Sequence, residues 1–185
     1  MALLTLEEAC AQINLAAPSE AQRAELTAYI ESVTPVIEGH VGAVEPREVT
    51  QTIEGRGPTL ALLTVPVLEL VSLTPLDGGP GLDVARLHVD GPSGIVRRLG
   101  GGAWFGRGPW TATYRAGRPD IPATINLAAR LLVQHLWRTQ LRSSPGLAGG
   151  GDDYSVTEPV PGMGYAVPNR VLQLLEPFKV GPGVA

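Results

Sequence analysis

The chain has 185 residues, of which 17% are charged, and a formal net charge of −4. This length suits one domain or two small ones, and a core of that size needs neither a disulfide nor a structural metal. The single cysteine, Cys10, agrees with this. No apolar run reaches the roughly 20 residues that span a bilayer, and residues 1–6 lack the basic start of a signal peptide. We therefore expect a protein that stays in a cytoplasm or enters a particle assembled there, without a membrane partner.

Two helices are expected within residues 1–46. Thr5 and Ser19 each lie three residues before a Glu or Gln, which is the spacing of a capping box. Apolar residues then recur every three or four positions, as in a helix with one buried face. The pattern predicts a short helix over about 6–13 and a long one over about 20–41.

The period changes between residues 47 and 117, where short apolar and β-branched runs alternate with Gly- and Pro-rich turns. In the last run, Trp110, Ala112 and Tyr114 alternate with polar residues, as a strand with one buried face requires. We expect this β-rich insertion to form one antiparallel sheet of five or six short strands. The expected strands contain Val49 and Ile53, Leu60–Val65, Val67–Leu73, Leu87–Val89, Gly94–Leu99 and Trp110–Tyr114.

A second long helix is expected over residues 118–142, because a proline and an acid stand near its start and apolar residues again recur at helical spacing. Residues 143–167 are rich in Gly, Pro, Ser and Asp, which predicts an extended arm. The C-terminal part, 143–185, also carries a short amphipathic helix over 168–176. The predicted fold is α+β: a helical core of two N-terminal helices and one long later helix, with an inserted antiparallel β-sheet and an extended C-terminal arm ending in a short helix.

The sequence contains no recognisable catalytic or cofactor-binding constellation. Ser93 stands in Gly-Pro-Ser-Gly-Ile, which lacks the final glycine of a nucleophile elbow. The Gly-rich stretches match neither the dinucleotide nor the P-loop pattern, and the only lysine, Lys179, lies far from them. The three histidines stand on three different predicted elements, so none has a spaced partner for a metal. We expect no enzyme, no cofactor and no metal site.

Charge is distributed unevenly along the chain: residues 1–48 carry a net charge of −6 and residues 86–118 carry +5. This asymmetry suggests either self-complementary association or an anionic partner. Alternatively, the uneven distribution of exposed charges has no functional meaning. If the two segments meet across a subunit boundary, the candidate residues are Glu25, Glu31 and Glu38 on the acidic side and Arg97, Arg98, Arg107 and Arg115 on the basic side.

Two apolar features are candidate contacts. The loop 100–109 places Trp104 and Phe105 between glycines, where a partner would bury them; alternatively, Trp104 folds onto Trp110. Arg107 beside them could pair with a partner's acid or face DNA phosphates. The terminal helix has an apolar face that we expect to dock away from the subunit's own core; alternatively, this face packs on the chain's own long helix. Its candidate contact residues are Arg170, Val171, Leu172, Leu174 and Leu175.

Four stretches, taken in order, carry a resemblance to a known family. They are Leu4–Ala9 with the long helix ending at Gly42, the strand-to-helix joint Thr111–Gly117 with Asp120–Pro122, the helix Leu131–Trp137, and the ending Gly164–Pro177 with its Pro-x-Arg and Leu-Leu-x-Pro motifs. Together they cover most of the chain, and the ordered set resembles the head-tail connector (adaptor, head-completion) family of tailed bacteriophages. The β insertion is longer than in the most compact members.

The resemblance implies a non-enzymatic virion protein that forms a ring beneath the portal, expected to be a dodecamer, and extends the DNA channel. Its implied partners are other copies of itself, the portal protein, a tail or stopper protein and the packaged double-stranded DNA. It would act in the virion neck, after assembly in the bacterial host cytoplasm. A tail-completion or other phage neck protein is the alternative. A DNA-binding regulator is less favoured, because Arg130, Arg138 and Arg142 are spread over three turns and form no base-reading motif.

Overall fold

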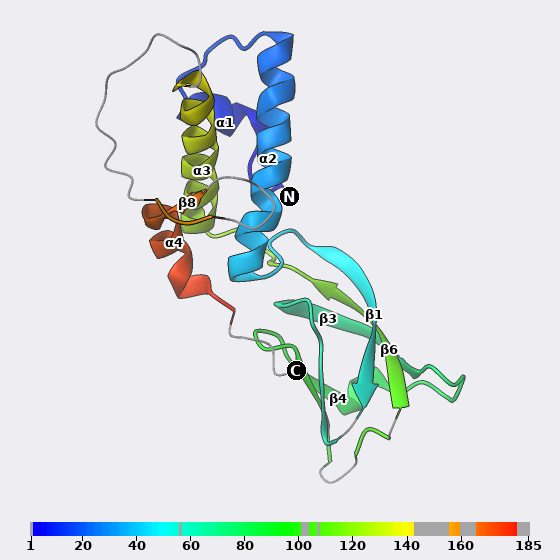
Figure 1. Cartoon of the computed structure of the whole chain (residues 1–185). Coiled ribbons are helices and arrows are strands. Elements are labelled where there is room, and N and C mark those ends of the chain that lie inside the picture. The colour runs from blue at the N-terminus through cyan, green and yellow to red at the C-terminus, as the bar shows by residue number, and fades with distance from the viewer. Residues whose placement is uncertain are drawn as a thin grey trace. The chain divides into compact units, whose positions relative to one another are not determined.

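The computed structural model describes residues 2–55, 57–100, 104–106, 108–142, 156–159 and 166–180. The chain divides into two compact units (Figure 1). The helical unit comprises residues 2–41 and 121–179, and the β unit comprises residues 42–120 with Val180. Helices and antiparallel sheets together confirm the expected α+β class.

The helical unit is built on two long helices that lie side by side (Figure 1). A short N-terminal helix packs against both, and a C-terminal helix packs on the second long helix. The four helices and the final 3-10 turn are α1 (Leu6–Gln12), α2 (Glu20–Val41), α3 (Ala123–Arg142), α4 (Asn169–Leu175) and η2 (Glu176–Phe178).

Both predicted capping boxes are present in the helical unit. The Glu8 N–H donates to Thr5 Oγ1 at 3.2 Å, and the Gln22 N–H donates to Ser19 Oγ at 3.3 Å. In each box the Glu or Gln side chain accepts a hydrogen bond from the N–H of the capping residue, at 2.9 Å in both cases. Donors that a helix start leaves unpaired are thereby satisfied, which is why the helices begin where the sequence predicts.

The β unit contains two three-stranded antiparallel sheets, with strand orders β1-β6-β3 and β2-β5-β4. The expectation of a single sheet is therefore wrong. β6, the last strand of the unit, lies between β1 and β3, and a pairing between such distant segments cannot be deduced from local periodicity. The elements are β1 (Arg47–Gly55), β2 (Thr59–Ala61), β3 (Val67–Pro75), η1 (Val84–Arg86), β4 (Leu87–Asp90), β5 (Ile95–Arg98) and β6 (Gly108–Ala116).

Residues of both sheets contribute to one hydrophobic core in the β unit. Trp110, Ala112 and Tyr114 of β6 are buried, which confirms the alternation expected for this strand. The Tyr114 hydroxyl accepts a hydrogen bond from the Thr64 N–H at 3.0 Å and donates one to Gln51 Oε1 at 3.1 Å. The one polar group of this large buried side chain is thus paired, as burial requires.

Part of the expected C-terminal arm is a hairpin instead. β7 (Val156–Pro159) pairs antiparallel with β8 (Ala166–Pro168), immediately before α4. The rest of the arm, residues 143–155 and 160–165, lies outside the described residues. The short helix expected over 168–176 is present as α4 and continues into η2.

Candidate subunit-contact surface

Most of the exposed large hydrophobic side chains belong to the β unit. Among the described residues, six of the seven lie within residues 42–120, and Leu127 of α3 is the other. Single exposed hydrophobic residues are ordinary, but their concentration in one unit makes the β unit the candidate for a contact surface. The six are Leu63, Leu68, Val71, Leu76, Leu99 and Trp104.

Two β-bulges in β3 place hydrophobic residues on the surface. The register of β3 on β6 shifts between Val67 and Glu69 and again between Leu70 and Ser72, so that Leu68 and Val71 oppose no residue. A bulged strand loses strict alternation, and the buried residues of β3 are accordingly three apart. Leu68 is therefore 39% exposed and Val71 48% exposed. We did not predict this pair, because an apolar run without alternation does not indicate which members face solvent.

The end of β3 borders an apolar hollow. Leu76, 57% exposed, lines a hollow of about 370 Å³ together with Pro75, Pro109 and Trp110. The Leu76 N–H donates to the Pro109 carbonyl at 3.0 Å, which holds the rim in place. With Leu63 in the β2–β3 connection, exposed apolar side chains thus occur at both ends of β3 as well as along it.

The two adjacent aromatic residues of the β5–β6 loop have opposite environments. Trp104 is 66% exposed, as a contact residue should be, whereas Phe105 is only 1% exposed. The Phe105 ring meets the Trp110 ring edge to face, with centroids 6.1 Å apart at an interplanar angle of 84°. The prediction that Phe105 contacts a partner is therefore wrong. The alternative, in which Trp104 folds onto Trp110, is also wrong. Arg107 lies outside the described residues.

Arg97 and Arg98, treated as one candidate pair in the sequence, have different surroundings. Arg97 is exposed and pairs across strands with Thr59 and His88. Arg98 is half-buried, and its guanidinium carbon lies 5.2 Å from the centre of the Phe105 ring. Because adjacent residues of a strand point to opposite faces of the sheet, the two arginines cannot both meet one flat partner surface.

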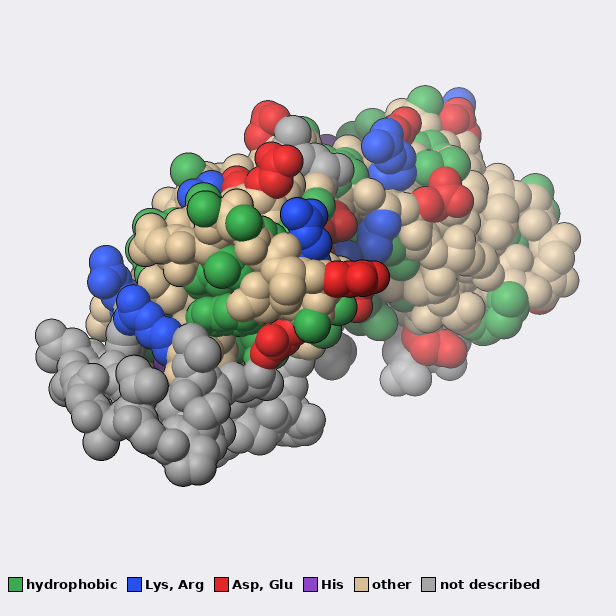
Figure 2. Space-filling view, turned by 90° about the horizontal axis from the view of Figure 1, so that it is seen from above, with side chains coloured by type: hydrophobic (Ala, Val, Ile, Leu, Met, Phe, Trp, Pro, Cys, Tyr) green, Lys and Arg blue, Asp and Glu red, His purple; other side chains and the backbone are tan. Residues whose placement is uncertain are grey.

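The net positive charge of segment 86–118 is balanced by acidic residues elsewhere in the β unit. The β unit, residues 42–120, contains eight acidic and eight basic residues, so its net charge is zero. Arg115 lies between Glu48 of β1 and Glu69 of β3 in the sheet register, which compensates its charge within the subunit. Figure 2 shows acidic and basic side chains interspersed on one face of the molecule, with no continuous patch of either sign.

The three acidic candidates on α2 also differ. Glu25 accepts a hydrogen bond from the Tyr29 hydroxyl at 2.8 Å; burial, and next the carboxylate, raise the pKa of Tyr29. Glu38 is half-buried and takes part in an interaction within the chain. Glu31 is exposed and has no partner among the described residues. Of the three, Glu31 is the residue most available to a second molecule.

The apolar face of α4 belongs to the subunit's own core. Val171 is 1% exposed and Leu175 is 2% exposed, and α4 packs on α3 of the same chain. The expectation that this face docks elsewhere is therefore wrong, because a short amphipathic helix is stable only when its apolar face is covered, and α3 covers it. Leu172 and Leu174 are half-buried, and Arg170 is exposed.

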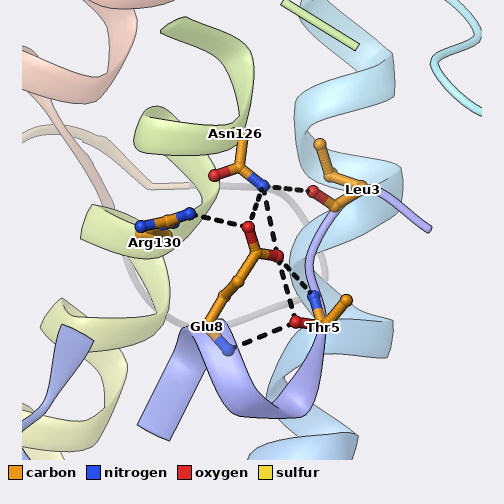
Figure 3. A network of polar contacts seen from close by, with 5 residues as sticks. All are labelled: Leu3, Thr5, Glu8, Asn126 and Arg130. Atoms are coloured by element: carbon orange, nitrogen blue, oxygen red, sulfur yellow. Dashed lines mark hydrogen bonds and ion pairs between the residues drawn. The ribbon is translucent and has the colours of Figure 1, made fainter. Parts of the chain in front are cut away.

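A polar network ties α1 to α3 within the helical unit (Figure 3). Glu8 of α1 accepts hydrogen bonds from the Thr5 N–H and from Arg130 Nη2, the latter at 2.6 Å. Asn126 Nδ2 donates to the Leu3 carbonyl at 2.8 Å. Arg130 is therefore a structural residue. The sequence offered only one hint of this, an arginine beside the apolar stripe of a helix.

We expect Glu8→Gln to lower the free energy of unfolding by roughly 1 kcal/mol at pH 7, the upper range for a partly exposed ion pair. The Thr5 N–H lowers the pKa of Glu8 most; the Arg130 guanidinium lowers it further, against the opposing effect of burial. A carboxyl group with a lowered folded-state pKa stabilises the protein above its unfolded pKa and loses this effect as pH falls through the folded pKa. Urea unfolding at pH 7 and pH 3 should therefore show a difference from wild type that shrinks in acid.

Glu7→Gln is the matched control, because Glu7 also lies in the first turn of α1 but is exposed. It should have less effect than Glu8→Gln at pH 7. Equal effects of the two substitutions would mean that the network contributes nothing beyond a helix-end charge.

The described residues contain no group of three or more His, Cys, Asp or Glu side chains able to hold a metal ion. No helix among them is long and apolar enough to cross a membrane. Cys10 is half-buried on α1.

Neither a protein-family model nor a curated protein matches the sequence. Solved structures do match the fold. A chain in the neck of an empty GTA particle, computed with C6 symmetry, aligns over 97% of this chain and 91% of its own length, with a TM-score of 0.67 and 19% identity. The chain therefore has the fold of a neck protein.

Two further matches agree. A chain in the neck of a native GTA particle, computed with C12 symmetry, covers 86% of this chain and 84% of its own length, at a TM-score of 0.58 and 17% identity. A chain in the virion of a native gene transfer agent (GTA) particle covers 97% of this chain and 91% of its own length, with a TM-score of 0.62 and 17% identity. The similarity spans both units of the chain, so neither unit is an addition to the shared fold.

Proposed function

We propose that the chain is a structural subunit of the neck of a tailed phage or phage-like particle. It forms a ring below the portal, extends the DNA channel and joins head to tail without catalysing a reaction. The observation that carries the proposal is the match of 97% of this chain to 91% of a neck chain, since a shared fold over nearly all of both chains leaves little room for a different architecture.

The surface of the β unit supports this role. Leu63, Leu68, Val71, Leu76 and Trp104 are exposed hydrophobic side chains, and contact with a neighbouring protein would remove them from water. In a ring, each subunit presents two different surfaces that meet head to tail. The proposed partners are other copies of the chain in a dodecamer, the portal protein and a tail or stopper protein. Packaged double-stranded DNA passes through the channel.

The proposed place of action is the virion neck, reached after assembly in the bacterial host cytoplasm. The test is the mass of the purified full-length chain by sedimentation velocity over a range of concentrations, combined with negative-stain images. Closed rings of twelve 19.4-kDa subunits are expected, either alone or on the matching portal ring.

Other outcomes would contradict the dodecameric ring below the portal. A hexameric ring that binds tail tubes and not portals would indicate a tail-completion protein. A compact dimer that binds short duplex DNA would indicate the regulator. A monomer that stays monomeric with the portal present would overturn the proposal.

A further inference from the structure

We propose that a hollow in the β unit, here called the Arg98 hollow, receives the Glu31 side chain of a second copy of this chain. The inference rests on the proposed function, because it assigns one contact between neighbouring subunits of the ring.

The Arg98 hollow has a volume of about 360 Å³. Its walls combine leucine side chains with two arginines and one aspartate: Leu82, Asp83, Arg86, Leu87, Arg98 and Leu99. Leu99 is 58% exposed, so the hollow has an apolar rim open to water. Apolar walls with a guanidinium group suit a side chain that has a hydrocarbon stem and a carboxylate end.

Arg98 is held in position but lacks a full set of hydrogen-bond partners. Its guanidinium carbon lies 5.2 Å from the centre of the buried Phe105 ring, and stacking of this kind restricts the planar group. Its Nε is buried and donates to no acceptor among the described residues. A carboxylate that enters the hollow would accept hydrogen bonds from the Nη groups of Arg98, which has no acidic partner among the described residues.

A DNA phosphate fits the hollow less well than a carboxylate side chain. Asp83 lies in the wall, and its carboxylate, 4.0 Å from Arg86, repels a phosphate group of DNA with its neighbouring phosphates more strongly than it repels one carboxylate. The β unit as a whole has no net positive charge to attract a polyanion. A partner that brings apolar contacts together with one carboxylate gains from the leucine walls, which a phosphate does not.

The helical unit of a second copy supplies the complementary charge. Residues 2–41 and 121–179 contain ten acidic and six basic residues. On α2, Glu31 is exposed and unpaired among the described residues, unlike Glu25, which holds the Tyr29 hydroxyl. Ala28 and Ala24, one and two turns before Glu31, are exposed and small, so another surface can approach the helix closely here.

The resulting contact joins two different surfaces of the same chain. Arg98 lies in the β unit and Glu31 in the helical unit, so the contact is head to tail and repeats around a closed ring. Each subunit uses its hollow toward one neighbour and its α2 toward the other.

The test uses charge reversal in the full-length chain. Arg98→Glu and Glu31→Arg, each alone, should raise the concentration needed for ring formation at least tenfold, because each places like charges in contact. An equimolar mixture of the two variants should form rings again, since each reversed hollow accepts the reversed α2 of the other variant and each native hollow accepts native α2. The double variant should also recover assembly.

Arg97→Glu is the matched control, since it makes the same charge change at the neighbouring residue on the opposite face of β5. The concentration that this variant needs for ring formation should stay within twofold of the wild-type value. Melting temperatures separate effects on folding from effects on assembly. Because Arg98 packs on Phe105, Arg98→Glu is expected to lower the melting temperature. Glu31 lies on an exposed helix face, so Glu31→Arg should leave the melting temperature unchanged. The Glu31→Arg result therefore tests the contact even if Arg98→Glu folds poorly.

Rings that persist in both single variants, or a mixture that stays unassembled although both variants are folded, would overturn this contact while the ring itself stands. If Arg98→Glu weakens duplex DNA binding and leaves assembly unchanged, the hollow takes a phosphate and the contact is wrong. If the wild-type chain forms no ring, the proposed function fails and this contact fails with it.

Discussion

Replacing Phe105 by alanine is expected to lower the free energy of unfolding by about 3–5 kcal/mol, the usual cost of deleting a buried aromatic ring. Phe105 is 1% exposed, meets Trp110 edge to face and supports the Arg98 guanidinium. Its backbone N–H also donates to the Gly57 carbonyl at 2.9 Å, which fixes the loop against the unit. Urea unfolding followed by circular dichroism would measure the loss.

Trp104→Ala is the control at the adjacent position. Because Trp104 is 66% exposed, its removal should change stability by less than about 0.5 kcal/mol. Assembly should respond in the opposite order, with Trp104→Ala raising the concentration needed for ring formation. A larger stability loss for Trp104→Ala than for Phe105→Ala would show that the two environments are assigned the wrong way round.

Leu175→Ala is expected to lower the free energy of unfolding by about 2–5 kcal/mol, as for other buried leucines. Leu175 is 2% exposed where α4 packs on α3, so the substitution leaves a cavity inside the helical unit. Deleting residues from 169 onward should destabilise the chain further, since it uncovers α3. Thermal unfolding of the full chain and of both variants would measure these losses.

Leu172→Ala is the matched control for α4, because Leu172 is only half-buried on the same helix. It should lower the free energy of unfolding by less than Leu175→Ala does. If Leu175→Ala and the deletion both remain as stable as wild type and lose only their binding to the portal, α4 docks on a partner and its packing on α3 is not maintained in solution.

These predictions separate the residues that hold the subunit together from those available for assembly. Phe105, Leu175 and Arg130 act within the subunit, although the first two stood among the candidate contacts. The residues that remain for partners are Trp104 and the β3 side chains Leu68 and Val71, together with Glu31 and the Arg98 hollow. The contact residues that we propose therefore lie mainly in the β unit and not in the C-terminal helix.

The sequence by itself determined the elements and their order. Capping at Thr5 and Ser19, apolar spacing in α2 and α3, and alternation in β6 are local properties, because a hydrogen bond or a helical turn involves residues only a few positions apart. The α+β class and the positions of the six strands in the β unit followed from them. The absence of a nucleophile elbow and of a phosphate-binding loop was also visible in the local patterns.

Only the tertiary structure decided the strand partners and the exposure of individual residues. β6 lies between β1 and β3, and the bulges at Leu68 and Val71 exist only in that pairing. Trp104 and Phe105 are adjacent and chemically alike, yet the fold buries one and exposes the other. The basic segment 86–118 loses its net charge because folding brings acids from residues 45–83 into the same unit. Burial and charge compensation depend on residues that are far apart in the chain. Local periodicity therefore cannot predict them.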